Sequence, residues 1–329
     1  MNNIKKRILV ISPNFSGGGL ETRIKTIIER FHEEFSYSLL TKTPTHEMRI
    51  SPSKFINKIY NWDKQDIAIN DADIISIHPF SVFTELKNLH LLDNKKLIYT
   101  LHGEASFLDN INSFGDKIDI FYSVSEKLIQ IFKILYPQYS NKIYLFKNYY
   151  PKQNKTLYKK FKTNKNILIS ITNTEKQGYL NNIIKRIPHD YCIHIIGSEQ
   201  FQQFEHPNVV YDGFVNINSY LSKNQFCIAF TRGGYAAMDL IVHGIPLILI
   251  YERNSKFYAE VLNRNDFEKL SNQNFVTFKE SRYEDIPDII RLISLNHNNF
   301  ELFNLLKKYN DYSSMYNPYS CIEGEVYAK

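Results

Sequence analysis

The sequence is poor in cysteine and contains no long apolar run. Its three cysteines, Cys192, Cys227 and Cys321, are far apart, which excludes a disulfide framework and offers no pair with zinc-binding spacing. This pattern is typical of a protein in a reducing compartment. No stretch approaches the roughly 18–20 apolar residues that a membrane-spanning helix requires. Near the N-terminus the apolar run stops at Pro13, so we predict a buried strand rather than a signal peptide, and a cytoplasmic protein.

The chain also lacks a strong charge of one sign. Lys and Arg number 40 against 34 Asp and Glu, which gives a net charge of +6 over 329 residues. This excess is too small to indicate a nucleic-acid partner, and we predict none. The hydrophobic share of 43% and the charged share of 22% are ordinary for a globular protein and exclude general disorder. The length predicts two domains.

Two segments, 53–65 and 152–165, combine clustered lysines with aromatic residues. The first has apolar residues at helical spacing, Phe55, Ile59 and Trp62, which predicts an amphipathic helix. Such a helix either packs on a core or contacts an anionic membrane surface or an acidic acceptor. The second is either a solvated linker or part of the same contact. Peripheral contact with the inner face of the cell membrane therefore stays open for both segments.

Short apolar runs alternate with segments of helical spacing along the chain, which predicts an α/β protein. Between residues 148 and 166 Lys, Asn and Tyr dominate and neither periodicity is present, so we place a domain boundary there. We expect one domain over 1–150, a second over 151–310, and a tail over 311–329 that packs back on the first domain. Each array predicts a doubly wound parallel sheet, with ligands beyond the carboxyl ends of its strands.

The expected strands cover residues 6–12, 36–40, 74–78, 96–101, 119–123, 143–146, 166–171, 191–197, 209–211, 225–231 and 246–251. The expected helices cover residues 20–35, 82–86, 126–135, 179–186, 217–222, 234–243, 256–262, 286–295 and 300–308.

Two glycine-rich loops lie at predicted strand-to-helix junctions. There, glycine allows a close backbone approach and the helix N-terminus attracts an anion. The first loop consists of Gly17, Gly18 and Gly19, with Glu21 just beyond. It matches neither the dinucleotide nor the Walker pattern, so a flexible connector is the alternative.

The second loop opens the helix predicted over 234–243. Arg232 and the glycine N–H groups are suited to a diphosphate, and Asp239, two turns into the helix, to ribose hydroxyls. The alternatives are a surface ion pair for Arg232 and an ordinary solvated position for Asp239. The loop consists of Thr231, Arg232, Gly233, Gly234 and Tyr235.

Seven short motifs follow one another in an order that resembles the GT-B glycosyltransferases of the family 4 type, over about residues 4–250. In the first half they are 18–21, 100–103, 123–126 and 146–149, and in the second half 195–198, 210–214 and 239–246. The resemblance implies the GT-B architecture, with two Rossmann-like domains facing a cleft. It implies a donor, expected to be a UDP-sugar, in the second domain and an acceptor in the first, without a metal or a cofactor.

The resemblance implies a glycosyltransferase of the hexosyl or N-acetylhexosaminyl class. The acceptor would be a glycan, a lipid-linked molecule or a protein. The bias toward Lys, Asn and Ile suggests bacterial surface glycan or glycoprotein synthesis. Two other readings remain: a nucleotide-sugar epimerase or hydrolase of GT-B form, and a non-catalytic member that binds a sugar or a partner.

The sequence departs from the family pattern at the donor site. Retaining members carry two Glu separated by seven residues, whereas here the second position is Asp239 and the first is Thr231. The loop also resembles that of inverting GT-B enzymes, so the stereochemical outcome stays open. For the diphosphate, Lys176 matches the family lysine approximately. Thr172 or Asn173 occupies the neighbourhood of the usual arginine, which Arg232 can replace.

The remaining candidates complete the expected site. Gly197 and the loop of Gly17 to Gly19 are assigned to the donor, with the acceptor entering against that same loop. His102, which ends a predicted strand, faces the donor sugar by resemblance, and a histidine there can bind a hydroxyl or act as a base. Glu104 and Glu21 are competing bases if the enzyme inverts, and His78 is a weaker candidate of the same kind as His102.

Overall fold

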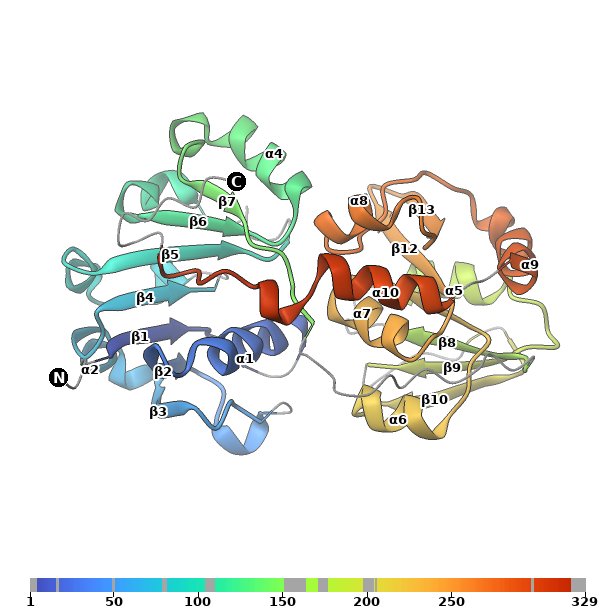
Figure 1. The fold of residues 1–329 in the computed structure, drawn as a ribbon, viewed down its shortest axis with the longest axis horizontal. Coiled ribbons are helices and arrows are strands. Elements are labelled where there is room, and N and C mark those ends of the chain that lie inside the picture. Colours follow the sequence, from blue (N-terminus) through green and yellow to red (C-terminus); the bar gives the residue numbers. More distant parts are fainter. Residues whose placement is uncertain are drawn as a thin grey trace. The chain divides into compact units, whose positions relative to one another are not determined.

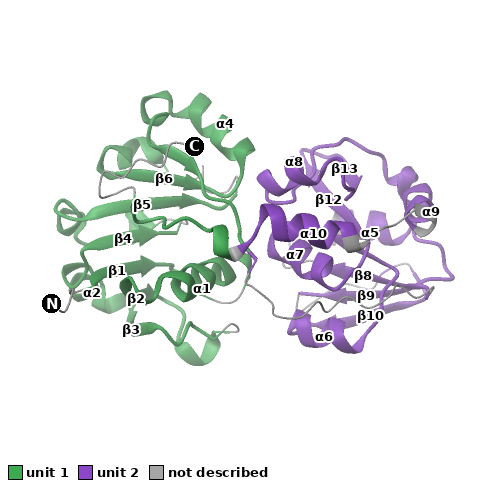
Figure 2. Ribbon diagram, viewed as in Figure 1, with its two compact units in different colours: residues 1–149, 312–329 green, residues 150–311 purple. Residues whose placement is uncertain are grey.

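The computed structural model describes residues 5–15, 18–48, 51–78, 82–103, 110–150, 164–170, 177–197, 204, 206–296 and 299–320. The chain divides into two compact units, shown in green and purple in Figure 2. Unit 1 comprises residues 1–149 and 312–329, and unit 2 comprises residues 150–311. Within the described residues, no helix is long and apolar enough to cross a membrane.

The described part of unit 1 contains a seven-stranded sheet in the order β3-β2-β1-β4-β5-β6-β7 (Figure 1). All neighbouring strands are parallel. The order reverses between β1 and β4, and such a switch point is where α/β sheets commonly bind ligands. The strands are β1 Lys6–Ile11, β2 Phe35–Thr41, β3 Ile56–Asn61, β4 Ile74–Ile77, β5 Lys96–Leu101, β6 Ile120–Ser123 and β7 Ile143–Leu145.

Helices cover both faces of this sheet. On one face α1 buries an apolar stripe that includes Ile24, Ile27, Ile28 and Phe31, spaced as one side of a helix. Side chains from α2, α3 and α4 pack on the other face. The helices are α1 Gly19–Phe31, α2 Gln65–Asn70, α3 Val82–Glu85 and α4 Glu126–Leu135, with short 3₁₀ turns η1 Thr45–Glu47, η2 Trp62–Lys64, η3 Leu89–Leu92, η5 Ile111–Ser113, η6 Gly115–Lys117 and η7 Pro137–Tyr139.

The segment 312–320 packs on unit 1, although it follows unit 2 in the sequence. The hydroxyl of Tyr122 donates to the carbonyl of Pro318 at 2.7 Å, and that of Tyr316 donates to the carbonyl of Leu145 at 2.7 Å. The side chain of Tyr319 is buried in the same core as α1. These contacts attach the end of the described chain to the α1 face of the sheet.

The described part of unit 2 contains a six-stranded sheet in the order β10-β9-β8-β11-β12-β13. Its strands are parallel except β13, which runs antiparallel to β12 at the edge. The strands are β8 Asn166–Ser170, β9 Cys192–Ile196, β10 Val209–Gly213, β11 Ile228–Thr231, β12 Leu247–Arg253 and β13 Lys256–Val261.

Helices also cover both faces of the second sheet. One core joins it to side chains of α6, α7, α8 and α10, and the other to side chains of α5 and α9. Helix α7 stops at Val242, just before Gly244, whose φ of 72° is the left-handed conformation that ends helices. The helices are α5 Gln177–Ile184, α6 Ile217–Lys223, α7 Gly234–Val242, α8 Phe267–Asn272, α9 Ile286–Asn296 and α10 Asn299–Tyr309, with 3₁₀ turn η9 Tyr283–Asp285; the turn η10 Tyr312–Ser314 belongs to unit 1.

Two helix predictions are wrong, and both segments are edge strands. Residues 56–61 form β3, which pairs with β2, and residues 256–261 form β13, which pairs with β12. In β13 burial alternates, with Phe257 and Ala259 buried, as a half-covered strand requires. The turn before it places Asn254 and Ser255 at positive φ, which turns the chain back on β12.

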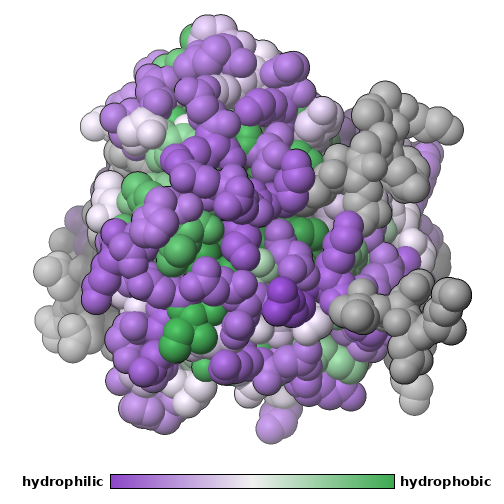
Figure 3. Space-filling model, turned by 90° about the vertical axis from the view of Figure 1, so that its left-hand side faces the viewer, coloured by the Kyte–Doolittle hydropathy of each residue, from purple (hydrophilic) through white to green (hydrophobic). Residues whose placement is uncertain are grey.

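Figure 3 shows the surface at the left-hand side of Figure 1, coloured by hydropathy. Among the residues coloured there, hydrophilic side chains dominate and the apolar ones form small, separate patches. Small patches of this kind are ordinary on protein surfaces and do not indicate a partner.

Candidate functional sites

In unit 1, two histidines lie at the carboxyl ends of neighbouring strands. His78 follows β4 and His102 follows β5, and Nδ1 of His78 lies 2.8 Å from Nε2 of His102. Desolvation lowers the pKa of His78 to about 3, with a smaller effect from the charge of Arg23. Desolvation, His78 and Arg23 lower the pKa of His102 well below its ordinary value. Both rings are therefore neutral at pH 7, with one nitrogen of the contact donating and the other accepting.

Arg23, on α1, supplies a buried positive charge in the same region. Its guanidinium donates to Oδ1 of Asn148 at 2.7 Å and to the carbonyl of Phe146, and lies 4.6 Å from the centroid of the Phe146 ring. Only 1% of the residue is exposed. The fixed cation adds to desolvation, the larger effect, in disfavouring the protonated form of both histidines. No sequence motif singles out Arg23, although it lies four residues before Ile27, on the buried side of a predicted helix.

Glu21 is buried in the first turn of the same helix, where a carboxylate is favoured by the helix dipole. A Cβ added at Gly18 would lie 3.2 Å from Oε2 of Glu21, whereas one at Gly19 would meet nothing within 4 Å. Of the unit 1 candidates, the structure thus joins His102 to His78 and places Glu21 on the helix that carries Arg23. Gly17 and Glu104 lie outside the described residues.

In unit 2, the loop between β11 and α7 has a conformation that requires its glycines. Gly233 has a φ of 106°, and a Cβ added there would lie 2.2 Å from the carbonyl oxygen of Phe275. Gly234 has a φ of 63°, and its N–H donates to the carbonyl of Asn274 at 2.8 Å. Asn274 and Phe275 themselves have a φ of 57°. The 274–275 turn therefore supports the loop from behind through a close backbone contact.

Three other candidates in this loop have different surroundings. Thr231 is buried at the end of β11, and its hydroxyl accepts a hydrogen bond from the N–H of Gly233 at 3.4 Å. The guanidinium of Arg232 is partly exposed and lies 5.0 Å from the centroid of the Tyr251 ring. Tyr235 is buried in the core between the sheet and α7. Arg232 is thus the partly exposed charged residue of the loop, whereas Thr231 and Tyr235 are buried.

Asp239, on α7, is not an ordinary solvated residue. Its Oδ1 accepts a hydrogen bond from the hydroxyl of Tyr150 at 2.9 Å. Burial raises the pKa of Asp239 to about 6, while hydrogen bonds from Tyr150 and Asn218 partly offset this rise. The carboxyl group is therefore held by two neutral side chains, one from the start of the unit and one from α6.

Gly197 directly follows β9 with a φ of 102°, and its N–H donates to the carbonyl of Gly213 at 2.9 Å. This bond fixes the carboxyl ends of β9 and β10. Two further donor candidates, Asn173 and Lys176, lie outside the described residues. Among the residues that the structure does describe, no group of three or more His, Cys, Asp or Glu side chains is arranged to hold a metal ion.

No protein-family model and no curated protein sequence matches the chain. Solved structures match it along almost its whole length. HepE from Anabaena, in complex with UDP and glucose, has a TM-score of 0.68 at 11% identity, and the match covers 98% of this chain and 100% of that one. The lipopolysaccharide outer core galactosyltransferase WaaB, in its apo form, has a TM-score of 0.64 at 12% identity, with 98% and 100% covered. The chain has the GT-B fold.

The likeness extends to a further GT-B structure. An alpha-glucosyltransferase in complex with UDP-glucose and DNA has a TM-score of 0.62 at 13% identity, and the match covers 96% of this chain and 98% of that one. The predicted fold class is confirmed, since the two α/β units are the two Rossmann-like domains of a GT-B protein. The antiparallel β13 is the one departure from parallel pairing within the described strands.

Proposed function

We propose that this GT-B protein is a glycosyltransferase that takes a sugar from a nucleoside diphosphate sugar, with a UDP-sugar as the first candidate. The observation that carries the proposal is the loop between β11 and α7, where Arg232 stands at the N-terminus of a helix that also bears Asp239. HepE and the alpha-glucosyltransferase, which share the fold, were solved with UDP or UDP-glucose.

Unit 2 holds the donor in this proposal. The guanidinium of Arg232, the first-turn amides of α7 and the amine of Lys176 neutralise the diphosphate as it leaves, which is where negative charge develops. Asp239 accepts hydrogen bonds from the ribose hydroxyls, and Gly197 and Asn173 are the further donor candidates. No metal ion or cofactor takes part in this scheme.

Unit 1 holds the acceptor. An acceptor hydroxyl attacks the anomeric carbon of the sugar, the bond from that carbon to the diphosphate breaks, and the hydroxyl proton passes to a base. His102 is neutral at pH 7 because its pKa is lowered, so it serves by hydrogen bonding to a sugar hydroxyl rather than by charge. Glu21 and Glu104 are the candidate bases.

For the acceptor we propose a glycan, a lipid-linked molecule or a protein in bacterial surface glycan or glycoprotein synthesis. In the segment 53–65, Lys54 before β3, Lys58 on β3 and Lys64 at the end of η2 are exposed. An edge strand with exposed lysines is suited to an anionic surface, so peripheral membrane contact is part of the proposal. The other basic segment, 152–165, lies outside the described residues except for 164 and 165.

A donor screen tests the function. Purified protein is heated with UDP, GDP, CMP or TDP sugars, and the correct donor raises the unfolding temperature because it binds the folded state. Titration calorimetry then compares Arg232→Ala, which should lose at least tenfold in affinity, with Arg264→Ala. Arg264 pairs with Glu301 and is 69% exposed, so its removal should leave donor binding unchanged.

Product analysis separates the possible activities. Transfer to an added acceptor supports the glycosyltransferase. Sugar release or epimerisation at enzyme-like rates without an acceptor would contradict it, and so would tight donor binding without any turnover across a broad acceptor panel. Equal donor affinity in both arginine variants would overturn the assignment of the donor loop.

A further inference from the structure

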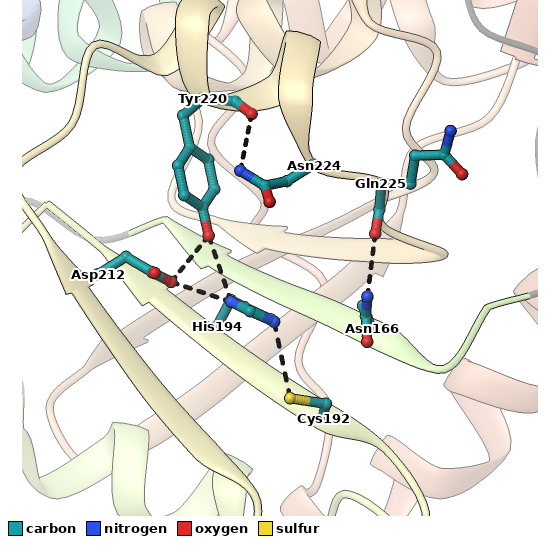
Figure 4. Close-up of polar contacts among 7 residues, drawn as sticks. All are labelled: Asn166, Cys192, His194, Asp212, Tyr220, Asn224 and Gln225. Atoms are coloured by element: carbon teal, nitrogen blue, oxygen red, sulfur yellow. Dashed lines mark hydrogen bonds and ion pairs between the residues drawn. The ribbon is translucent and has the colours of Figure 1, made fainter.

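Unit 2 carries a polar cluster that the proposed function does not use (Figure 4). Cys192 and His194 lie two residues apart on β9 and so project from the same face of the sheet. Asp212 comes from the neighbouring strand β10, and Tyr220 from α6. Cys192 begins β9, whereas the donor candidate Gly197 follows the opposite, carboxyl end of that strand.

The hydrogen bonds of the cluster fix which nitrogen of His194 carries its proton. Oδ2 of Asp212 accepts from the hydroxyl of Tyr220 at 2.7 Å and lies 3.0 Å from Nδ1 of His194. An ionised carboxylate has no proton to donate, so Nδ1 of His194 is the donor. In the neutral imidazole Nε2 is then an acceptor, and it lies 3.6 Å from Sγ of Cys192. Nε2 of His194 is therefore placed to accept the thiol proton of Cys192.

Aromatic packing holds the imidazole in this orientation. The ring of Phe226 lies 5.3 Å from that of His194 and stacks on that of Tyr220 at 5.8 Å. The hydroxyl of Tyr220 also lies 3.3 Å from Nδ1 of His194. Asp212 and Tyr220 thus lie at Nδ1 of His194, Phe226 lies edge-on to its ring, and Cys192 lies at Nε2.

The cluster is open to solvent, unlike the other described cysteine. The side chains of His194 and Asp212 are 20% and 24% exposed, and Cys192 is partly exposed. Cys227 is buried, its thiol donates to the carbonyl of Asn166 at 3.1 Å, and burial raises its pKa to about 11. Cys227 is therefore an internal reference for an inert thiol.

We propose that Cys192 is a nucleophilic thiol, activated by His194 and Asp212, that undergoes exchange with small disulfides. The S–H proton passes to Nε2 of His194, and Asp212 stabilises the resulting imidazolium. The thiolate attacks one sulfur of the disulfide, so a new S–S bond forms at Sγ while the original S–S bond breaks. The second sulfur leaves as a thiolate and takes the proton back from His194. No other oxidant or reductant is needed.

The test measures the rate at which the full-length protein reacts with oxidised glutathione between pH 5 and 9, with the modified cysteine identified by peptide mass spectrometry. The group that contacts the thiol of Cys192 is His194 on its own strand, whose other ring nitrogen contacts Asp212 on β10 and Tyr220 on α6. The exposed ion pair of Lys165 and Asp190 flanks the start of β9. We expect Cys192 to be the cysteine modified at pH 6.5, while the buried Cys227 stays unmodified.

Substitutions separate an activated thiol from a structural network. His194→Gln should slow the reaction of Cys192 at pH 6.5 at least tenfold. His189→Gln removes an exposed histidine three residues before Cys192 whose ring packs on His206, outside the cluster, so it should retain the fast reaction. A reaction rate at pH 6.5 that is the same in His194→Gln as in the wild type would overturn the proposal.

A second variant covers the case in which His194→Gln does not fold, as judged by circular dichroism. Asp212→Asn removes the carboxylate that fixes the protonated nitrogen, so Cys192 should again react more slowly at pH 6.5. If Cys192 in this variant reacts as fast as in the wild type, the cluster only joins β9, β10 and α6, and the proposal fails.

Discussion

The hydroxyl of Tyr150 donates a hydrogen bond to the carboxyl group of Asp239 at 2.9 Å, 89 positions further along the chain. Tyr150 is the first residue of unit 2, and Asp239 lies in the helix that opens at the donor loop. The Asp239 carboxyl, which we propose binds the ribose, is thus positioned by Tyr150 at the start of unit 2. Because burial raises the pKa of this carboxyl to about 6, its charge at neutral pH costs the fold some stability.

Asp239→Asn should therefore stabilise the protein above pH 6 while weakening the binding of the donor. The pKa of Asp239 rises from 3.8 in the unfolded chain to about 6 in the folded one, which corresponds to about 3 kcal/mol. The stabilising contribution of the protonated group is complete below pH 3.8 and is lost as the pH rises through 6. Calorimetric unfolding should show the variant more stable at pH 8 and equal to the wild type at pH 4. A less stable variant at pH 8 would contradict this.

Tyr150→Phe should raise the pKa of Asp239 further, because the hydroxyl bond is one of the two that lower it. The loss of this bond should cost about 1–2 kcal/mol of unfolding free energy. Denaturant unfolding and NMR titration of the carboxyl group measure the two effects. Tyr309→Phe is the matched control, since the Tyr309 hydroxyl donates to Glu268 at an exposed site. An unshifted Asp239 titration in Tyr150→Phe would mean that the bond is absent in solution.

The sequence predicted the alternation of strands and helices, because short β-branched runs and helical spacing are local patterns. It failed at 56–61 and 256–261, where pairing at a sheet edge outweighed an apparent helical spacing. Within the candidate sites, the sequence pattern identified residues next to glycines, such as Arg232, and residues at strand ends, such as His102. It missed Arg23 and Tyr150, whose partners Asn148 and Asp239 are distant in the sequence, so nothing local signals the contact.

Gly233→Ala should destabilise unit 2 by about 2–4 kcal/mol. The new Cβ would lie 2.2 Å from the carbonyl oxygen of Phe275, and the φ of 106° is strained for any side chain. Thermal unfolding of the full-length protein measures the change. Gly19→Ala is the control, because a Cβ there meets nothing within 4 Å and alanine is favoured in a helix. Equal unfolding temperatures for the two variants would show that the backbone of the 274–275 turn is not in close contact with Gly233.

In His78→Gln the free energy of unfolding should decrease less steeply as the pH falls. In the folded protein the pKa of His78 is lowered to about 3, whereas the unfolded chain titrates near 6.5. Between these values the unfolded state binds a proton that the folded state does not. The neutral ring therefore contributes stability above pH 6.5 that is lost as the pH falls toward 3, by about 1.4 kcal/mol for each pH unit.

Unfolding free energies measured from pH 7 down to pH 4 should fall less steeply in His78→Gln than in the wild type. His90 is exposed on η3, so His90→Gln should keep the wild-type slope. The His78→Gln variant also tests activity, since His78 is the hydrogen-bond partner of His102. We expect transfer to slow at least tenfold in His78→Gln with donor affinity little changed, because the donor is proposed to be held by unit 2. If His78→Gln keeps the wild-type dependence of unfolding free energy on pH and the wild-type turnover, His78 contributes neither to acid sensitivity nor to transfer.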